Sequence, residues 1–153
     1  DALPILLRGW TITAAFRYTD VRQTINGKLR EKPLTPRFKG LITTSYSTPL
    51  KKWQFDVTAQ FNGGGRMPDP DPEKPLWESN YKWHPQLMAQ VTKYWRTCSL
   101  YLGAENMTNF TQTNPVIAAD QPFSPDFDAS MVYGPINGWK VYLGFRWNLK
   151  NDQ

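Results

Sequence analysis

The sequence has only one cysteine and one histidine, so it offers little of the chemistry that clusters of these residues perform. Cys98 cannot form an intramolecular disulfide, and its simplest interpretation is a buried small apolar side chain. His84 stands alone beside Pro85, and a lone loop histidine is rarely a ligand. The sequence contains no Ser/His/Asp grouping, no Cys/His pairing and no glycine-rich phosphate loop before a helix. We therefore expect no enzyme, with no catalytic residues, no metal site and no cofactor.

The sequence also lacks the long apolar run that a membrane helix requires. No segment approaches the roughly 20 consecutive apolar residues that cross a bilayer, which excludes a helical membrane protein. Residues 1–7 lack the basic start and long apolar centre of a signal peptide, so we expect a mature chain or part of a larger one. The mean hydropathy of −0.57 would ordinarily indicate a water-soluble protein. Membrane β-strands, however, give a weak hydropathy signal because their apolar residues alternate with polar ones.

Aromatic residues and positive charge are both abundant. The aromatic share of 14% is high for a soluble domain and typical of a barrel with two interfacial belts. The net charge of +5 could indicate a nucleic-acid partner, but the positions of the cations argue against it. One cluster falls in an expected loop, Lys51 and Lys52 fall at a turn, and Arg17, Lys140 and Arg146 fall on polar strand faces. These loop cations are Lys28, Arg30, Lys32, Arg37 and Lys39. A solvated loop is the simplest interpretation, and contact with lipopolysaccharide phosphates is the sharper alternative.

Alternating apolar and polar residues predict six β-strands. The expected strands cover residues 9–22, 38–48, 53–62, 86–95, 100–106 and 139–149. Asn26-Gly27 predicts a tight hairpin, because this pair favours the turn that joins twisted antiparallel strands. The segment from Gly63 to Pro85 is rich in glycine and proline, which predicts a long connection without a strand, with Gly63 to Gly65 at a loop tip. Alternating Asp69, Asp71 and Glu73 are held apart by prolines, which disfavours a calcium site.

The expected connections alternate in length. Long ones follow the first, third and fifth strands, and short ones follow the second and fourth, as in outer-membrane barrels with short periplasmic turns and long extracellular loops. We expect a ligand or a surface lipoprotein to contact the long loops at residues 23–36, 63–85 and 111–138. Residues 1–8 fit neither a strand nor a helix start and are expected to end a preceding turn.

The last expected strand, from Trp139 to Leu149, carries a resemblance to a known family. Tyr142, Gly144, Trp147 and Leu149 resemble the C-terminal assembly signal of bacterial outer-membrane β-barrels. The segments LYLGAENMTNF at 100–110 and FDASMVYGPINGWKVYLGFRW at 127–147 resemble the closing segments of TonB-dependent receptors of Bacteroidetes type.

The resemblance implies an all-β fold, an antiparallel up-and-down transmembrane β-barrel segment. Residues 1–153 would be the C-terminal part of the barrel domain, without the plug domain, in a barrel of about 22 strands. The implied function is energy-coupled uptake of a scarce nutrient across the outer membrane of a Gram-negative bacterium. The implied partners are the remaining strands of the same barrel, the lipid bilayer and lipopolysaccharide, the TonB complex through the missing plug, the barrel assembly machinery and a surface lipoprotein.

This interpretation assigns the two faces of each strand. Asp56 lies in mid-strand, and a carboxylate there costs little free energy if its face borders a water-filled lumen. In a dry core it would need a partner. Trp10, Trp53, Trp95 and Trp147 are expected in the periplasmic aromatic belt. The residues expected to face lipid are Trp10, Ile12, Phe16, Trp53, Phe55, Val57, Phe61, Val141, Leu143 and Phe145.

Two other classes of protein remain open from the sequence. One is a soluble β-sandwich or lipocalin-like binding module, whose apolar faces would build an ordinary core. The other is a subunit that contributes strands to an oligomeric pore. About six strands cannot close a membrane barrel, since known single-chain barrels begin at about eight strands. The transporter interpretation therefore needs further strands from elsewhere.

Overall fold

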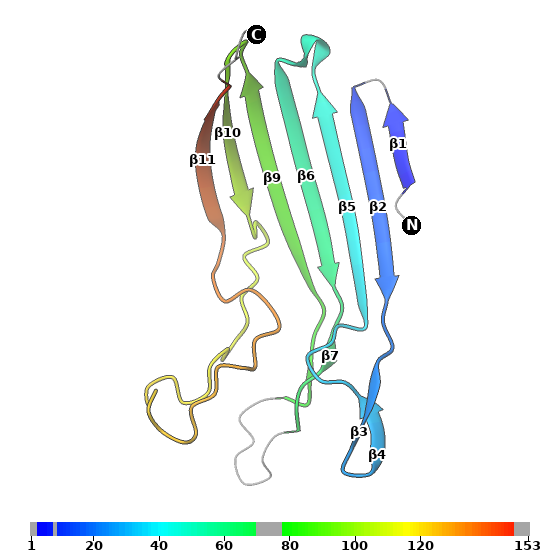
Figure 1. Ribbon diagram of the computed structural model, residues 1–153, viewed down its shortest axis with the longest axis vertical. Coiled ribbons are helices and arrows are strands. Elements are labelled where there is room, and N and C mark those ends of the chain that lie inside the picture. The colour runs from blue at the N-terminus through cyan, green and yellow to red at the C-terminus, as the bar shows by residue number, and fades with distance from the viewer. Residues whose placement is uncertain (1–2, 8, 70–77, 149–153) are drawn as a thin grey trace, which may run out of the picture.

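The computed structural model describes residues 3–7, 9–69 and 78–148, in which seven antiparallel strands form one sheet (Figure 1). In sheet order the strands are β1 (Leu3–Leu7), β2 (Trp10–Tyr18), β5 (Phe38–Ser47), β6 (Trp53–Asn62), β9 (His84–Tyr94), β10 (Cys98–Glu105) and β11 (Lys140–Trp147). Each of these strands pairs with the next one along the chain, so the topology is up-and-down. Within the described residues β1 and β11 are the two edges of an open sheet, and no closed barrel is formed.

The expected all-β antiparallel fold is confirmed, and the six long strands correspond to the six predicted segments. Strand β6 has the predicted bounds. The Asn26-Gly27 turn joins the small hairpin of β3 (Arg22–Ile25) and β4 (Lys28–Glu31). Both turn residues have positive φ, 49° at Asn26 and 73° at Gly27, which is the geometry that this residue pair favours.

The prediction for the first residues was wrong, because they form the additional edge strand β1. Its backbone pairs with β2 from Leu3 opposite Ala14 to Leu7 opposite Trp10. The leucine-rich segment has no alternating pattern, so periodicity could not identify it. An edge strand also tolerates Pro4, which cannot donate a ladder hydrogen bond, because one side of the strand has no neighbour.

The long connection between β6 and β9 also contains strand structure that the sequence did not predict. Strands β7 (Gly65–Arg66) and β8 (Asn80–Tyr81) pair there, and β9 begins at His84. The three glycines lie against the sheet instead of at a loop tip, since a Cβ added to Gly64 would lie only 2.5 Å from the Tyr81 carbonyl oxygen. Glycine at this position permits the close approach of the two backbones.

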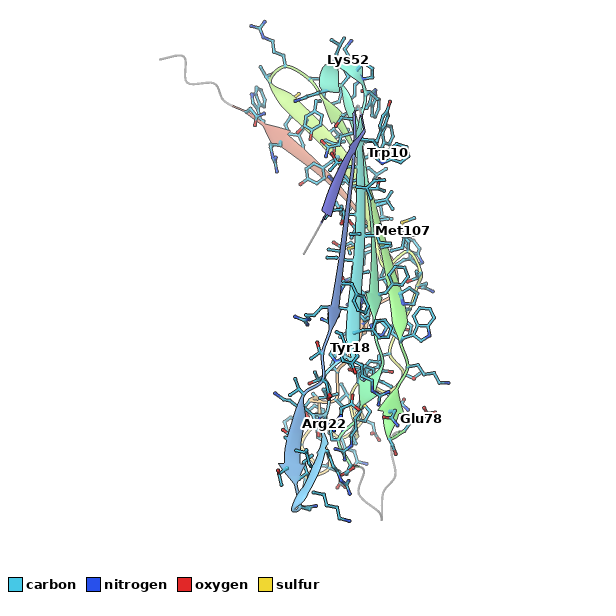
Figure 2. The ribbon with its side chains drawn as sticks, turned by 90° about the vertical axis from the view of Figure 1, so that its right-hand side faces the viewer. Trp10, Tyr18, Arg22, Lys52, Glu78 and Met107 are labelled. Carbon is cyan, nitrogen blue, oxygen red and sulfur yellow. The ribbon has the colours of Figure 1, made fainter. Side chains whose placement is uncertain are left out.

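The two ends of the sheet differ in the connections that they carry. The short connections, including the 3-10 helix η1 (Pro49–Lys51), lie at one end, which we call the turn end. The long connections lie at the other end, which we call the loop end (Figure 1). In the perpendicular view Lys52 and Trp10 are toward the turn end, and Arg22 and Glu78 are at the loop end (Figure 2). The predicted alternation of connection lengths is therefore confirmed for the six long strands.

The strand register places most apolar side chains of the long strands on one face. One row of directly paired residues crosses six strands, from Trp10 through Tyr46, Phe55, Val91 and Leu102 to Leu143. The neighbouring row on the opposite face runs from Thr11 through Ser45, Asp56, Gln90 and Gly103 to Tyr142. We call these two surfaces the apolar face and the polar face.

The described part of the sheet has no conventional hydrophobic core. Among the described residues only two apolar side chains are buried, Met67 at 5% exposure and Tyr81 at 7%, and both belong to the loop end. On the apolar face Phe55 is 44% exposed and Leu143 is 69% exposed. No second layer of described residues covers this face (Figure 2).

Candidate functional site

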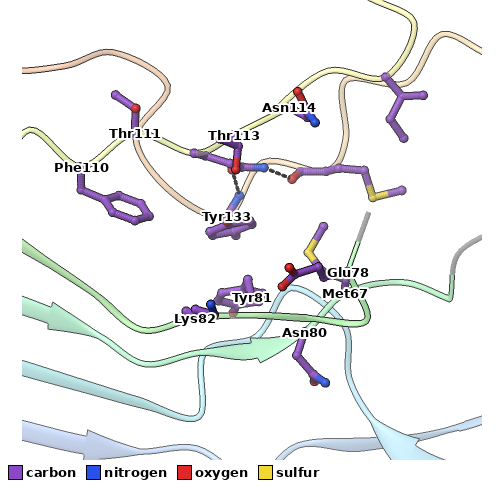
Figure 3. Close-up of a pocket in the computed structure, with 13 residues that line it drawn as sticks. Met67, Glu78, Asn80, Tyr81, Lys82, Phe110, Thr111, Thr113, Asn114 and Tyr133 are labelled. Carbon is purple, nitrogen blue, oxygen red and sulfur yellow. Dashed lines mark hydrogen bonds between the residues drawn. The ribbon is translucent and has the colours of Figure 1, made fainter. Parts of the chain in front are cut away.

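The loop end contains a cavity of about 410 Å³ between the two longest connections (Figure 3). One wall comes from the β6–β9 connection and the other from the β10–β11 connection. Its lining residues are Met67, Glu78, Asn80, Tyr81, Lys82, Phe110, Thr111, Gln112, Thr113, Asn114, Ile117, Met131 and Tyr133. Apolar side chains and hydrogen-bonding groups therefore border the same space, as is usual for small-molecule sites.

Stacked rings join the two walls of the cavity. Tyr81 of β8 stacks on Tyr133 with ring centroids 4.4 Å apart and planes 16° from parallel. His84, the first residue of β9, stacks on Phe110 at 4.4 Å and 8°. His84 is only 1% exposed. The expectation of an isolated loop histidine was therefore wrong: this ring is buried against an aromatic residue from the other connection.

The buried side chain of Gln112 holds the β10–β11 connection in its folded shape. Its Nε2 donates to the Met131 carbonyl oxygen at 2.7 Å, and its Oε1 accepts hydrogen bonds from the backbone N–H groups of Tyr133 at 2.9 Å and Gly134 at 3.2 Å. These bonds satisfy backbone groups that have no strand partner. Gln112 thereby fixes the position of Tyr133 opposite Tyr81.

The two stacked tyrosines carry hydroxyl groups that stay protonated well above neutral pH. Burial, together with the negative charge of Glu31, raises the pKa of Tyr81 to about 12. Burial and the nearby Glu78 also raise the pKa of Tyr133. The cavity therefore offers neutral hydroxyl and amide groups beside apolar rings, together with the charged side chains of Glu78 and Lys82. No group of three or more His, Cys, Asp or Glu residues that could hold a metal occurs in the described residues.

The polar face carries its own hydrogen-bond network. Asp56 accepts hydrogen bonds from Ser45 Oγ at 2.6 Å and from Gln54 Nε2 at 2.9 Å. On the other side of the same row, the Tyr142 hydroxyl donates to Gln90 Oε1 at 3.0 Å. Asp56 therefore has partners on its own face, and this face is equipped to border water.

The residues of the predicted assembly signal participate in a reciprocal packing of tyrosine on glycine. Tyr142 lies directly opposite Gly103, and Gly144 lies directly opposite Tyr101. Each tyrosine ring covers the opposite glycine so closely that an added Cβ would overlap the ring. Trp147 is exposed at the turn end and contacts Phe145 edge to face, and Leu149 lies outside the described residues.

All ten residues expected to face lipid lie on the apolar face. Nine of them are exposed, and Ile12 is half-buried among its neighbours. Trp10, Trp53, Trp95 and Trp147 all lie toward the turn end, since Trp10 and Trp53 begin their strands, Trp147 ends β11 and Trp95 follows β9.

Other candidate residues have more ordinary surroundings. Cys98 is a free, half-buried thiol opposite Trp147, so it is less buried than expected. In the basic loop cluster, Arg30 pairs with Asp69 at 3.0 Å and Arg37 pairs with Glu31 at 2.9 Å, which neutralises part of its charge. Asp71 and Glu73 lie outside the described residues.

The sequence interpretation did not identify the cavity. Its central residues, Tyr81, Tyr133 and Gln112, are far apart in the chain and follow no motif. The available signal was the presence of aromatic residues within otherwise polar connections, since exposed loops rarely need large rings.

No protein-family model matches this chain, and no curated protein or solved structure is similar enough to count as a match. Within the described residues, no helix combines the length and apolar character needed to cross a membrane.

Proposed function

We propose that the chain forms part of the wall of an outer-membrane receptor of the TonB-dependent class, which imports a scarce nutrient. The observation that carries the proposal is the exposed apolar face, which crosses six strands opposite a hydrogen-bonded polar face. Each square ångström of apolar surface left in water costs about 25 cal/mol. Contact with hydrocarbon removes that cost without a second layer of protein.

In this arrangement the apolar face borders lipid and the polar face borders the lumen. The turn end lies on the periplasmic side with its tryptophans at the interface, and the loop end lies outside the cell. Aromatic side chains favour this interfacial position because one part of the ring system is apolar and another part hydrogen-bonds. The cavity beside Tyr81 and Tyr133 then contributes to ligand capture, alone or together with a surface lipoprotein.

The open edges define the partners that the chain requires. Unpaired backbone groups cost several kcal/mol each in hydrocarbon, so β1 and β11 need neighbouring strands there. In the proposed receptor the remaining strands of the same barrel supply them. The barrel assembly machinery reads Tyr142, Gly144, Trp147 and Leu149, and the TonB complex acts through the plug region. Lys28 in the β3–β4 hairpin and Lys32 directly after it contact lipopolysaccharide.

The proposal is tested by vesicle flotation of the purified chain and of arginine variants. Phe55→Arg and Leu143→Arg each place a charge on the apolar face, where an arginine costs up to roughly 2–4 kcal/mol at the bilayer midplane and less toward the interface. We expect both variants to bind less lipid than the original chain. Gln60→Arg adds the same charge to the polar face and should bind vesicles nearly as well as the original chain.

The competing soluble module gives the opposite result. It predicts a chain that is monodisperse without detergent and does not float with vesicles. Equal binding by all three arginine variants would likewise contradict the assignment of the two faces.

A further inference from the structure

The turn end contains a second pocket, of about 530 Å³, that the proposed receptor function leaves unassigned. We call it the basic turn pocket and define it by its lining residues, which are Leu50, Lys51, Lys52, Lys93, Tyr94, Trp95 and Arg96. Four of these residues are cations and none is acidic. The backbone N–H of Tyr94 donates to the Lys52 carbonyl oxygen at 2.9 Å, which ties the β5–β6 and β9–β10 turns together. The fold thus holds cations from two turns side by side.

Lys93 occupies an unusual position in this pocket. In the register of the long strands it is the only charged residue on the apolar face, one residue before the end of β9. Its Nζ lies 4.3 Å from the centroid of the Trp53 ring and 6.0 Å from that of Trp95. Cation–π contacts of this kind hold an ammonium group against aromatic surface. Lys93 is therefore fixed at the level of the turn-end tryptophans.

The charge balance differs between the two ends of the sheet. The ion pairs among the described residues, such as Arg22 with Asp20 and Arg37 with Glu31, lie at the loop end. In the turn-end half of the sheet, Asp56 is the only described carboxylate, and it points to the polar face, where Ser45 and Gln54 bond to it. The cations of the basic turn pocket therefore lack a described carboxylate partner, and an external anion fits them.

Apolar surface next to these cations indicates the kind of anion. Leu50, in the same pocket, is 84% exposed, and the apolar face begins at Trp53. We propose that the basic turn pocket binds the phosphate of an anionic phospholipid, with the acyl chains of the lipid lying on the apolar face. This inference rests on the proposed membrane function. Basic clusters beside a membrane surface attract anionic headgroups, whereas a free phosphate would gain nothing from the adjoining apolar surface.

The test compares quenching of tryptophan fluorescence by two brominated lipids. The full chain is placed in phosphatidylcholine vesicles that contain a minor fraction of either brominated phosphatidylglycerol or brominated phosphatidylcholine. At low salt we expect about fivefold stronger association of the brominated phosphatidylglycerol, the preference that one effective cation contact supplies. The double variant Lys52→Gln/Lys93→Gln should reduce this ratio to near one, whereas Lys93→Arg should retain it. Arg17→Gln/Lys140→Gln removes the same charge on the polar face and should leave the ratio unchanged.

Each result decides between the two proposals. Quenching by neither lipid would overturn the membrane function and the lipid site together. Equal quenching by both lipids would overturn the lipid site and leave the membrane function in place. A preference abolished by inorganic phosphate, but not by chloride of equal ionic strength, would assign the pocket to a free anion and contradict the lipid assignment. Using the ratio of the two lipids cancels any change that a variant causes in tryptophan emission itself.

Discussion

The reciprocal packing of Tyr101 on Gly144 and of Tyr142 on Gly103 allows a quantitative test of what holds the last two strands together. A methyl group added at Gly103 would overlap the Tyr142 ring, so Gly103→Ala forces this ring to rotate away. The ring is the end of a side chain and can move without a shift of the backbone. The cost is therefore the set of contacts that the Tyr142 ring makes in its present position.

Two contacts of Tyr142 set the magnitude. Its hydroxyl bond to Gln90 at 3.0 Å contributes about 0.5–1.5 kcal/mol. Its edge-to-face contact with Tyr101, with centroids 6.3 Å apart and planes at 64°, contributes about 0.5–1.5 kcal/mol more. Replacing glycine by alanine restricts the unfolded chain and returns about 0.4–1 kcal/mol. We expect Gly103→Ala to lower the free energy of unfolding by about 1–2 kcal/mol.

A double-mutant cycle isolates the contribution of the ring. In a Tyr142→Ala background the added methyl meets no ring, so Gly103→Ala should become neutral or slightly stabilising. Urea unfolding of the lipid- or detergent-bound chain, followed by tryptophan fluorescence, measures all four corners of the cycle. Gly40→Ala is the matched control, because its Cβ would lie at an ordinary 3.6 Å from Phe61. Additive effects of Gly103→Ala and Tyr142→Ala would refute the reasoning.

Two further predictions concern the loop-end cavity. The folded-state pKa of Tyr81, about 12, exceeds the ordinary value of about 10, so folding favours the neutral hydroxyl. The resulting contribution to the free energy of unfolding is complete below about pH 10 and is lost as the pH rises through about 12. Ultraviolet titration of tyrosinate should show a late ionisation that Tyr81→Phe removes, and an unchanged curve would contradict the burial of this hydroxyl. Gln112→Ala leaves buried backbone groups without partners, at about 1–3 kcal/mol each, and should speed hydrogen exchange in the 111–135 segment. The exposed Thr113→Ala should have no such effect, and equal exchange in both variants would argue against bracing by Gln112.

The sequence predicted the parts of the fold that follow from local patterns. The alternation in residues 53–62 identifies β6, and Asn26-Gly27 identifies the β3–β4 turn, because each signal is contained within a few neighbouring residues. The face on which each side chain of a long strand lies can be predicted in the same way. Successive side chains alternate between the two faces, so placing one residue places all the others. Cross-strand pairing then joins these separate stripes into the continuous apolar face.

The parts that the sequence did not predict depend on contacts between distant segments. Strand β1 is defined by backbone pairing with β2. Such pairing does not require alternating apolar and polar residues, and the sequence of residues 3–7 has no such alternation. The two-residue strands β7 and β8 are held by the surrounding loops, as in the hydrogen bond from Met67 N to the Ser79 carbonyl oxygen at 2.9 Å. The burial of His84 likewise requires Phe110 from another connection. Each case involves a partner whose position only the folded chain determines.

The distribution of burial connects the fold with the proposed environment. A single sheet of a few strands is stable when its apolar face packs against something, and here the described residues supply no such layer. The polar face, in contrast, finds partners within the chain, since Asp56 and Tyr142 both have hydrogen-bond partners on this face. Within the described residues the polar face is thus satisfied by its own hydrogen bonds, whereas the apolar face is left uncovered. In the proposed membrane environment, lipid is therefore part of what stabilises the sheet, so binding of lipid and resistance to unfolding should rise and fall together in every variant of the apolar face.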